Sequence, residues 1–311
     1  MKYLSLTALL ILFTLTGFSQ DDELNRLLRA ESASNNGELL SNWDNYDSNI
    51  EEVKLLFLDL QDIDGKEHLI AVFQLESDQD LDFKFVEETY IRSDADPNEK
   101  YKVSKLFGSN LENELKLGEA YRVNKDEFPI YVALAFEQYP IAHRITIQES
   151  QVNPEETPWY WKNIDFLGYS YPQRFTNFNT NYAYDMVAQA PDERSWEFLR
   201  YMISFGLAAH QFKPKAASPF VILGTIQYLS NDIDASISLF TSALEEDYDL
   251  GILKDKEGTI YAFRANVYLT NFDITGDRKY LQSAIADYHK ACDLGSELGC
   301  IMYKKYKGKK P

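Results

Sequence analysis

The hydrophobic positions of this chain follow two different spacings in two successive regions. Between residues 51 and 149, short runs rich in β-branched and aromatic residues are separated by turn-forming clusters, a pattern that predicts β-strands. The predicted strands are 53–60, 68–76, 81–91, 101–107, 120–124, 129–137 and 144–149. Short strands at regular intervals, with no helical spacing between them, indicate an antiparallel sandwich.

A tight turn is expected between the first two strands. Asp64 and Gly65 can supply the positive φ angles that a short hairpin demands. Asp62, Asp64 and Gly65 also match part of a calcium-binding loop. However, Leu60 would occupy the first ligand position and Ala71 the position of the closing bidentate acid. We therefore expect a plain hairpin here and no calcium site.

From about residue 176 onward, apolar residues recur every three or four positions, which predicts helices. Clusters rich in Gly, Pro or Asp separate them, so the helices should be short and tightly connected. The predicted helices are 182–190, 195–212, 218–230, 234–247, 259–272, 279–295 and 297–306. A further short helix is predicted at 21–31, where three leucines share one face.

The first nineteen residues have the order of a secretory signal peptide: an early Lys2, an apolar run over 4–15, and small residues before the predicted cleavage at Gln20 or Asp21. A membrane anchor is the competing interpretation. It needs about 20 apolar residues, and the hydroxyls of Ser5, Thr7, Thr14 and Thr16 interrupt this N-terminal segment. No cysteine lies near the cleavage point, so lipid attachment is not expected there. We predict an exported chain, periplasmic or extracellular.

Length and charge refine this organisation. The 311 residues suit two domains after signal removal. We predict a signal peptide at 1–19, an N-terminal helix and linker at 20–50, the β-sandwich at 51–170 and the helical domain at 176–311. The net charge of −18 repels phosphate backbones, so no nucleic-acid partner is expected. No later stretch is apolar enough to insert into a membrane.

The β region resembles an immunoglobulin-like sandwich of unassigned function found in exported bacterial proteins. The resemblance rests on the succession FKFVEETYIRSDADPNEKYKVSKLFG, KLGEAYRV, FPIYVALAFEQYP and ITIQE, followed by PWYWKNIDF. It covers roughly a hundred residues and depends on apolar spacing. It implies a fold and no activity.

Two of the predicted helix pairs resemble each other and the tetratricopeptide repeat. In both copies, small residues let two helices approach closely and aromatic residues fill the space beside them. The first copy carries Phe220, Leu223, Gly224, Ser236, Phe240 and Ala243, with Tyr228 one place late. The second copy carries Tyr261, Arg264, Ala265, Tyr268, Ala284, Tyr288 and Ala291, with about seven extra residues near the turn. The fold class is therefore a β-sandwich followed by an all-α helical repeat domain.

The repeat resemblance implies a concave surface that receives a protein or peptide of the cell envelope. The family's groove positions correspond here to Val221, Thr225, Tyr228, Ala262, Asn266 and Leu269. They lack the paired Lys and Asn or Arg clamp expected of a groove that captures a terminal carboxylate. We therefore expect a non-catalytic interaction protein, with an alternative partner site on the sandwich.

A carbohydrate-binding module is the alternative function. Trp159 and Trp161 would share one face of an extended segment, where flat rings can stack on a sugar. The competing role for both rings is structural packing. An enzyme with carboxylate chemistry is a third possibility, but no known catalytic motif is present and the four histidines are scattered singly. No cofactor or metal is expected.

The two cysteines, Cys292 and Cys300, lie near the end of one predicted helix and about one turn into the next. Antiparallel packing of these helices would bring the sulfurs together. The arrangement resembles the cysteine-rich branch of the repeat superfamily, in which cysteines at this spacing bridge neighbouring helices. Two cysteines without a nearby zinc partner make a poor metal site, and their separation is not that of a redox Cys-x-x-Cys. We predict a structural disulfide, which export would favour.

Overall fold

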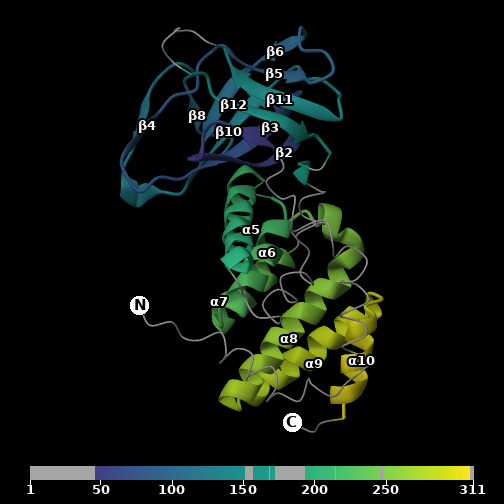
Figure 1. Cartoon of the computed structure of the whole chain (residues 1–311). Helices are drawn as coiled ribbons and strands as arrows, with labels where there is room; N and C mark the ends of the chain where they lie inside the picture. Colours follow the sequence, from purple (N-terminus) through teal and green to yellow (C-terminus); the bar gives the residue numbers. More distant parts are fainter. Residues whose placement is uncertain are drawn as a thin grey trace. The chain divides into compact units, whose positions relative to one another are not determined.

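The computed structural model describes residues 46–150, 157–167, 169–171, 193–213, 215–245 and 248–308, and side chains within 193–199 and at 251, 252 and 255 are left undescribed. The predicted signal peptide and the helices predicted at 21–31 and 182–190 lie outside the described residues. The chain divides into two compact units, a β unit within Glu38–Asn177 and a helical unit within Phe178–Pro311. Figure 1 shows the strands in the first and the helices in the second.

Two five-stranded antiparallel sheets form most of the β unit. The first sheet has the order β1 (Asp47–Ser48), β12 (Tyr160–Asp165), β11 (Arg144–Glu149), β5 (Thr89–Ser93) and β6 (Lys100–Lys102). The second sheet has the order β2 (Val53–Ile63), β3 (Lys66–Leu75), β10 (Ile130–Phe136), β7 (Lys105–Gly108) and β8 (Glu114–Leu115). A separate pair joins β4 (Leu81–Phe83) to β9 (Tyr121–Val123), and a short 3-10 helix, η2, spans Lys125–Glu127.

The predicted hairpin between β2 and β3 is confirmed. Its register pairs Ile63 with Lys66, which leaves two turn residues, and Asp64 and Gly65 have φ angles of 56° and 77°. The Asp62 carboxylate accepts a hydrogen bond of 2.9 Å from the Gly65 N–H. This short polar turn needs positive φ at both positions, which is the reason that Asp-Gly serves it.

Side chains from both five-stranded sheets meet in one hydrophobic core. Alternate residues of β3 contribute Leu69, Ala71, Phe73 and Leu75 to it. Trp161 of β12 packs on Phe73 with ring centroids 4.6 Å apart. Ile70 and Val72, which alternate with these core residues of β3, are also buried. The segment from Leu69 to Phe73 is therefore a continuous apolar run.

Two of the predicted strands are divided in the structure. The prediction for 101–107 becomes β6 and β7, which belong to different sheets. The Val103 N–H donates to Thr89 in the first sheet, and the Ser104 N–H donates to Ala135 in the second. The prediction for 81–91 likewise becomes β4 and β5, in different sheets. Apolar spacing continues through each of these transitions because the strands before and after the transition contribute side chains to the same core or pack against it.

Among the described residues, six α-helices form the helical unit. They are α5 (Glu193–Phe212), α6 (Ser218–Leu229), α7 (Ile233–Ala243), α8 (Glu257–Thr275), α9 (Arg278–Asp293) and α10 (Glu297–Tyr306), with a 3-10 segment, η3, at Gly251–Lys256. Three of them begin after side-chain caps at Asp232, Asp277 and Ser296. None of the described helices is both long enough and apolar enough for a membrane span.

Successive helices pack in pairs. In α6 and α7, a Cβ on Gly224 would lie 3.3 Å from Phe240, so the absence of a side chain permits the close approach. The Ser236 hydroxyl donates to the Gly224 carbonyl at 2.7 Å and is fully buried. In the second pair, the extra residues near the turn lengthen α8 to Thr275. Gly276, with φ of 70°, then ends that helix.

The disulfide between Cys292 and Cys300 is confirmed, and it joins α9 to α10. The helices lie close because Gly299 faces the Ala291 side chain without a Cβ of its own. Met302 and Tyr288 are fully buried in the core that α8, α9 and α10 share. The bridge therefore holds the last helix against the preceding pair.

Candidate functional site

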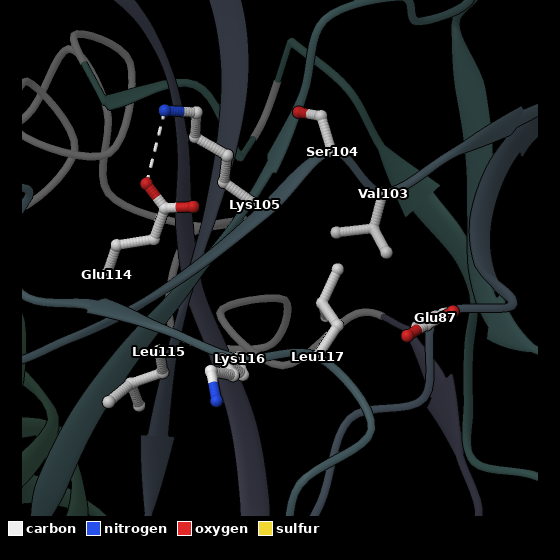
Figure 2. A pocket seen from close by; sticks show the side chains of 8 residues that line it. All are labelled: Glu87, Val103, Ser104, Lys105, Glu114, Leu115, Lys116 and Leu117. Carbon is white, nitrogen blue, oxygen red and sulfur yellow. Dashed lines mark hydrogen bonds and ion pairs between the residues drawn. The ribbon is translucent and has the colours of Figure 1, made fainter.

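One recess among the described residues is a groove at an edge of the β unit, with a volume of about 590 Å³. We call it the β8 groove. It is lined by Glu87, Val103, Ser104, Lys105, Glu114, Leu115, Lys116 and Leu117. Figure 2 shows these side chains, with Val103 and Leu117 in the middle of the view.

The β8 groove forms where two strands diverge. β7 and β8 pair at Leu106 with Leu115 and at Phe107 with Glu114. Beyond this ladder the chain before β7 turns toward the first sheet at Val103 and Ser104. After β8, the Gly118 N–H donates to the Phe85 carbonyl at 2.8 Å. The ladder therefore opens at this point, and a recess lies between the two segments.

The floor of the β8 groove is apolar. Val103 belongs to the hydrophobic core of the β unit, and Leu115 and Leu117 are partly buried against that core. Val103 and Leu117 point toward one another across the middle of the recess (Figure 2). A ligand that covers this floor would remove apolar surface from water, which favours binding.

The charged rim contains two lysines that already have carboxylate partners. Lys105 Nζ lies 2.7 Å from Asp64 and 3.2 Å from Glu114. Lys116 Nζ lies 2.9 Å from Glu119. The hydrogen bonds that Lys105 donates to Asp64 and Glu114 raise the pKa of Lys105, and the bond to Asp64 lowers the pKa of that carboxyl.

Glu87 completes the rim as an unmatched acid. Within the part of the chain that the structure describes, its carboxylate has no ion pair or hydrogen bond. The rim and its partners, Asp64 and Glu119, therefore carry four acids against two bases. The groove is suited to a ligand with an apolar part and a positive charge.

The residues predicted to form a concave groove in the helical unit lie mostly in the packing. Val221, Thr225, Ala262 and Leu269 are buried. The Thr225 hydroxyl donates to the Val221 carbonyl at 2.9 Å, one turn earlier in α6. These four side chains therefore do not line an open surface.

The two remaining predicted groove residues are half-buried and make polar contacts between helices. The Tyr228 hydroxyl lies 3.0 Å from Thr270 Oγ1, which links α6 to α8. The Tyr288 hydroxyl donates to Asn266 at 2.6 Å, which links α9 to α8. Burial raises the pKa of Tyr228 and of Tyr288, so both hydroxyls stay protonated in their networks.

Trp159 and Trp161 share one face of their segment, as predicted, and that face is turned to the core. Trp161 is 0% exposed, and its indole N–H donates to the Val53 carbonyl at 3.1 Å. Trp159 is half-buried and packs edge-on against Phe85 at 5.5 Å. Since Trp161 has no accessible ring face, the pair does not form a platform on which a sugar could stack.

Sequence reasoning missed the β8 groove. Its residues come from three separated stretches, and no motif connects Glu87 with Leu117. The clearest local feature is the change from one sheet to the other between Val103 and Ser104, which lies inside a continuous run of strand-like residues.

In the described residues no three His, Cys, Asp or Glu side chains gather as a metal site would require. No protein-family model, curated protein or solved structure matches this chain.

Proposed function

We propose that the chain is an exported, non-catalytic binding protein of the cell envelope, and that the β8 groove receives a segment of a partner protein. The observation that carries the proposal is the groove itself, which combines an apolar floor with a charged rim at a sheet edge. Peptides commonly bind at such edges, where the main chain and alternate side chains are both recognised.

Export is part of this proposal, and two features support it. The first nineteen residues have the pattern of a signal peptide. The disulfide between Cys292 and Cys300 suits an oxidising compartment, because cytosolic proteins rarely keep such bridges.

We further propose that the β unit is an immunoglobulin-like sandwich and that the helical unit is tetratricopeptide-like. Two five-stranded antiparallel sheets around one core support the first assignment. The sequential packing of α6 with α7 and of α8 with α9 supports the second, together with the close contact at Gly224. In this architecture the helical unit would act as a scaffold, because four of its six predicted groove residues are buried.

A random-peptide display library panned against the full-length exported protein tests the groove. We expect enriched peptides whose binding is lost in Leu117→Trp, since the larger ring fills the recess. The matched control is Leu60→Trp, which enlarges an exposed leucine on β2 that does not line the groove. Thermal melting of both variants shows whether the fold is retained.

Two results would contradict the proposed function. One is the absence of any enriched peptide. The other is a set of peptides that bind the correctly folded Leu117→Trp variant as well as the unchanged protein. Either result would mean that the β8 groove is not the binding site.

A further inference from the structure

We propose that the partner segment binds as an added β-strand along the outer edge of β8, with a basic residue opposite Glu114 and apolar residues on either side of it. This inference rests on the proposed function of the β8 groove and specifies the ligand. Its three parts are a main-chain contact, a charge pair and an apolar contact.

The strand order leaves one side of β8 open. β8 is the last strand of the second sheet and pairs with β7 on its inner side. The Gly108 N–H donates to the Asn113 carbonyl at 2.9 Å. Hydrogen-bonded pairs alternate in an antiparallel ladder, so Leu115 also directs its main-chain groups toward β7. Glu114 lies between them and directs its N–H and C=O outward.

The neighbouring outward groups already have side-chain partners. The Glu112 N–H donates to Asn110 Oδ1 at 2.9 Å. The Lys116 N–H donates to the Tyr121 hydroxyl at 2.7 Å, and that hydroxyl lies 3.3 Å from the Lys116 carbonyl. Within the described residues, Glu114 is therefore the position of this edge where a donor and an acceptor are both available to another strand.

Charge determines which residue of the partner should lie opposite Glu114. Residues directly opposite in an antiparallel pair have side chains on the same face, and opposite charges there are stabilising. The Glu114 carboxylate shares Lys105 with Asp64, so two acids on this face are matched by one base. A lysine or arginine opposite Glu114 would complete the pairing.

The adjacent residues of the partner would lie on the other face, because side chains alternate along a strand. On that face of β8, Leu115 packs against the core and lines the groove, as does Leu117 two residues later. Apolar side chains are the complement to this floor. The favoured ligand is thus an extended apolar-basic-apolar segment. A helical ligand is disfavoured because its main-chain groups are already bonded internally.

The test uses a fluorescent pentapeptide, Val-Lys-Val-Lys-Val, and the full-length protein. One of its lysines would lie opposite Glu114, so the N–H group of that lysine points toward the strand. We expect N-methylation of the lysines to lower affinity about tenfold. N-methylation of the valines, whose N–H groups point away, should change affinity less than twofold. The matched charge control, Val-Glu-Val-Glu-Val, should bind more weakly than the lysine peptide at low salt.

Hydrogen exchange measured by NMR locates the contact. Peptide binding should slow exchange of the Glu114 amide, whereas the Glu112 amide, which is already bonded to Asn110, should not change. Glu114→Gln removes the charge and keeps the main chain. It should therefore reduce the preference for lysine over glutamate and preserve the difference between the two N-methylated peptides.

The outcomes distinguish a failure of this inference from a failure of the proposed function. Equal losses from both N-methylated peptides, or no binding of the lysine peptide while library peptides still bind in a Leu117-dependent way, would overturn strand addition and leave the groove as the binding site. Failure of every peptide would refute the proposed function as well.

Discussion

Arg264 and Asp287 form a nearly buried ion pair that should be critical to the helical unit. Arg264 Nε lies 2.7 Å and Nη2 2.9 Å from the two carboxylate oxygens of Asp287. Arg264 Nη1 also donates to the Thr241 hydroxyl at 3.2 Å, so α7, α8 and α9 meet at this side chain. Tyr261 and Tyr268 flank the guanidinium at 5.5 and 5.8 Å.

The magnitude follows from burial. The two side chains are 15% and 10% exposed, so removal of one partner leaves a charge that water does not solvate well. Burial alone would lower the pKa of Arg264, but the hydrogen bonds and charge of Asp287 raise it, so the guanidinium remains charged in the pair. Breaking such a pair costs about 3 to 5 kcal/mol. We expect Asp287→Ala to destabilise the helical unit by about 3 kcal/mol, at the lower end because exposure is not zero.

The double variant Arg264→Met/Asp287→Leu distinguishes this mechanism from simple loss of packing. Replacing both charges with apolar groups of similar size removes the desolvation cost together with the attraction. The double variant should therefore be within about 1 kcal/mol of the unchanged protein. The loss of stability in the double variant would then be several kcal/mol smaller than the sum of the losses in the two single variants.

Urea unfolding followed by circular dichroism at 222 nm measures these free energies, because that signal comes mainly from the helices. The set comprises the unchanged protein, Asp287→Ala, Asp287→Leu, Arg264→Met and the double variant. The reasoning would be refuted if Asp287→Ala cost less than about 1 kcal/mol. It would also be refuted if the double variant were as unstable as the sum of Asp287→Leu and Arg264→Met.

Three further predictions concern other contacts. Replacing Cys292 and Cys300 with serine should lower the free energy of unfolding by about 2.5 kcal/mol, measured in urea; an unchanged midpoint would contradict a stabilising bridge. Gly299→Ala should lower the melting temperature, because the new methyl would lie 2.5 Å from Ala291; a melting temperature equal to that of the unchanged protein would contradict close packing there. Burial and a carboxylate hydrogen bond raise the pKa of Tyr139 to about 12, above its ordinary value of about 10. The free energy of unfolding should therefore fall as pH rises between these two values, because the unfolded chain loses the Tyr139 proton first. Tyr139→Phe should show a smaller fall over the same range, and identical pH profiles would count against the shift.

Local patterns in the sequence were enough to predict much of the secondary structure. The Asp64 and Gly65 turn was predictable because only a few residue types tolerate positive φ. Helix α10 has the same bounds as its prediction, since a capping Ser296 precedes a regular apolar spacing. The disulfide was also predictable, because the two helices that carry the cysteines are joined by a short turn.

Burial of individual side chains was less predictable. Val221 and Leu269 have the spacing of surface positions in a repeat, yet both are buried. Trp161 is of a residue type that is common in binding sites, yet here it is a core residue. Apolar side chains suit both an exposed binding surface and a packed interior, so the sequence alone does not distinguish these roles.

The sequence by itself determined the order of a β region and a helical region, the hairpin turn, the bounds of α10 and the pairing of the two cysteines, because each depends on residues close together in the chain. Only the tertiary structure decided that Val103 and Ser104 bond to different sheets, that β8 lies at an edge, and that Glu87 joins Leu117 at one groove. These features depend on contacts between distant segments, which no local spacing specifies.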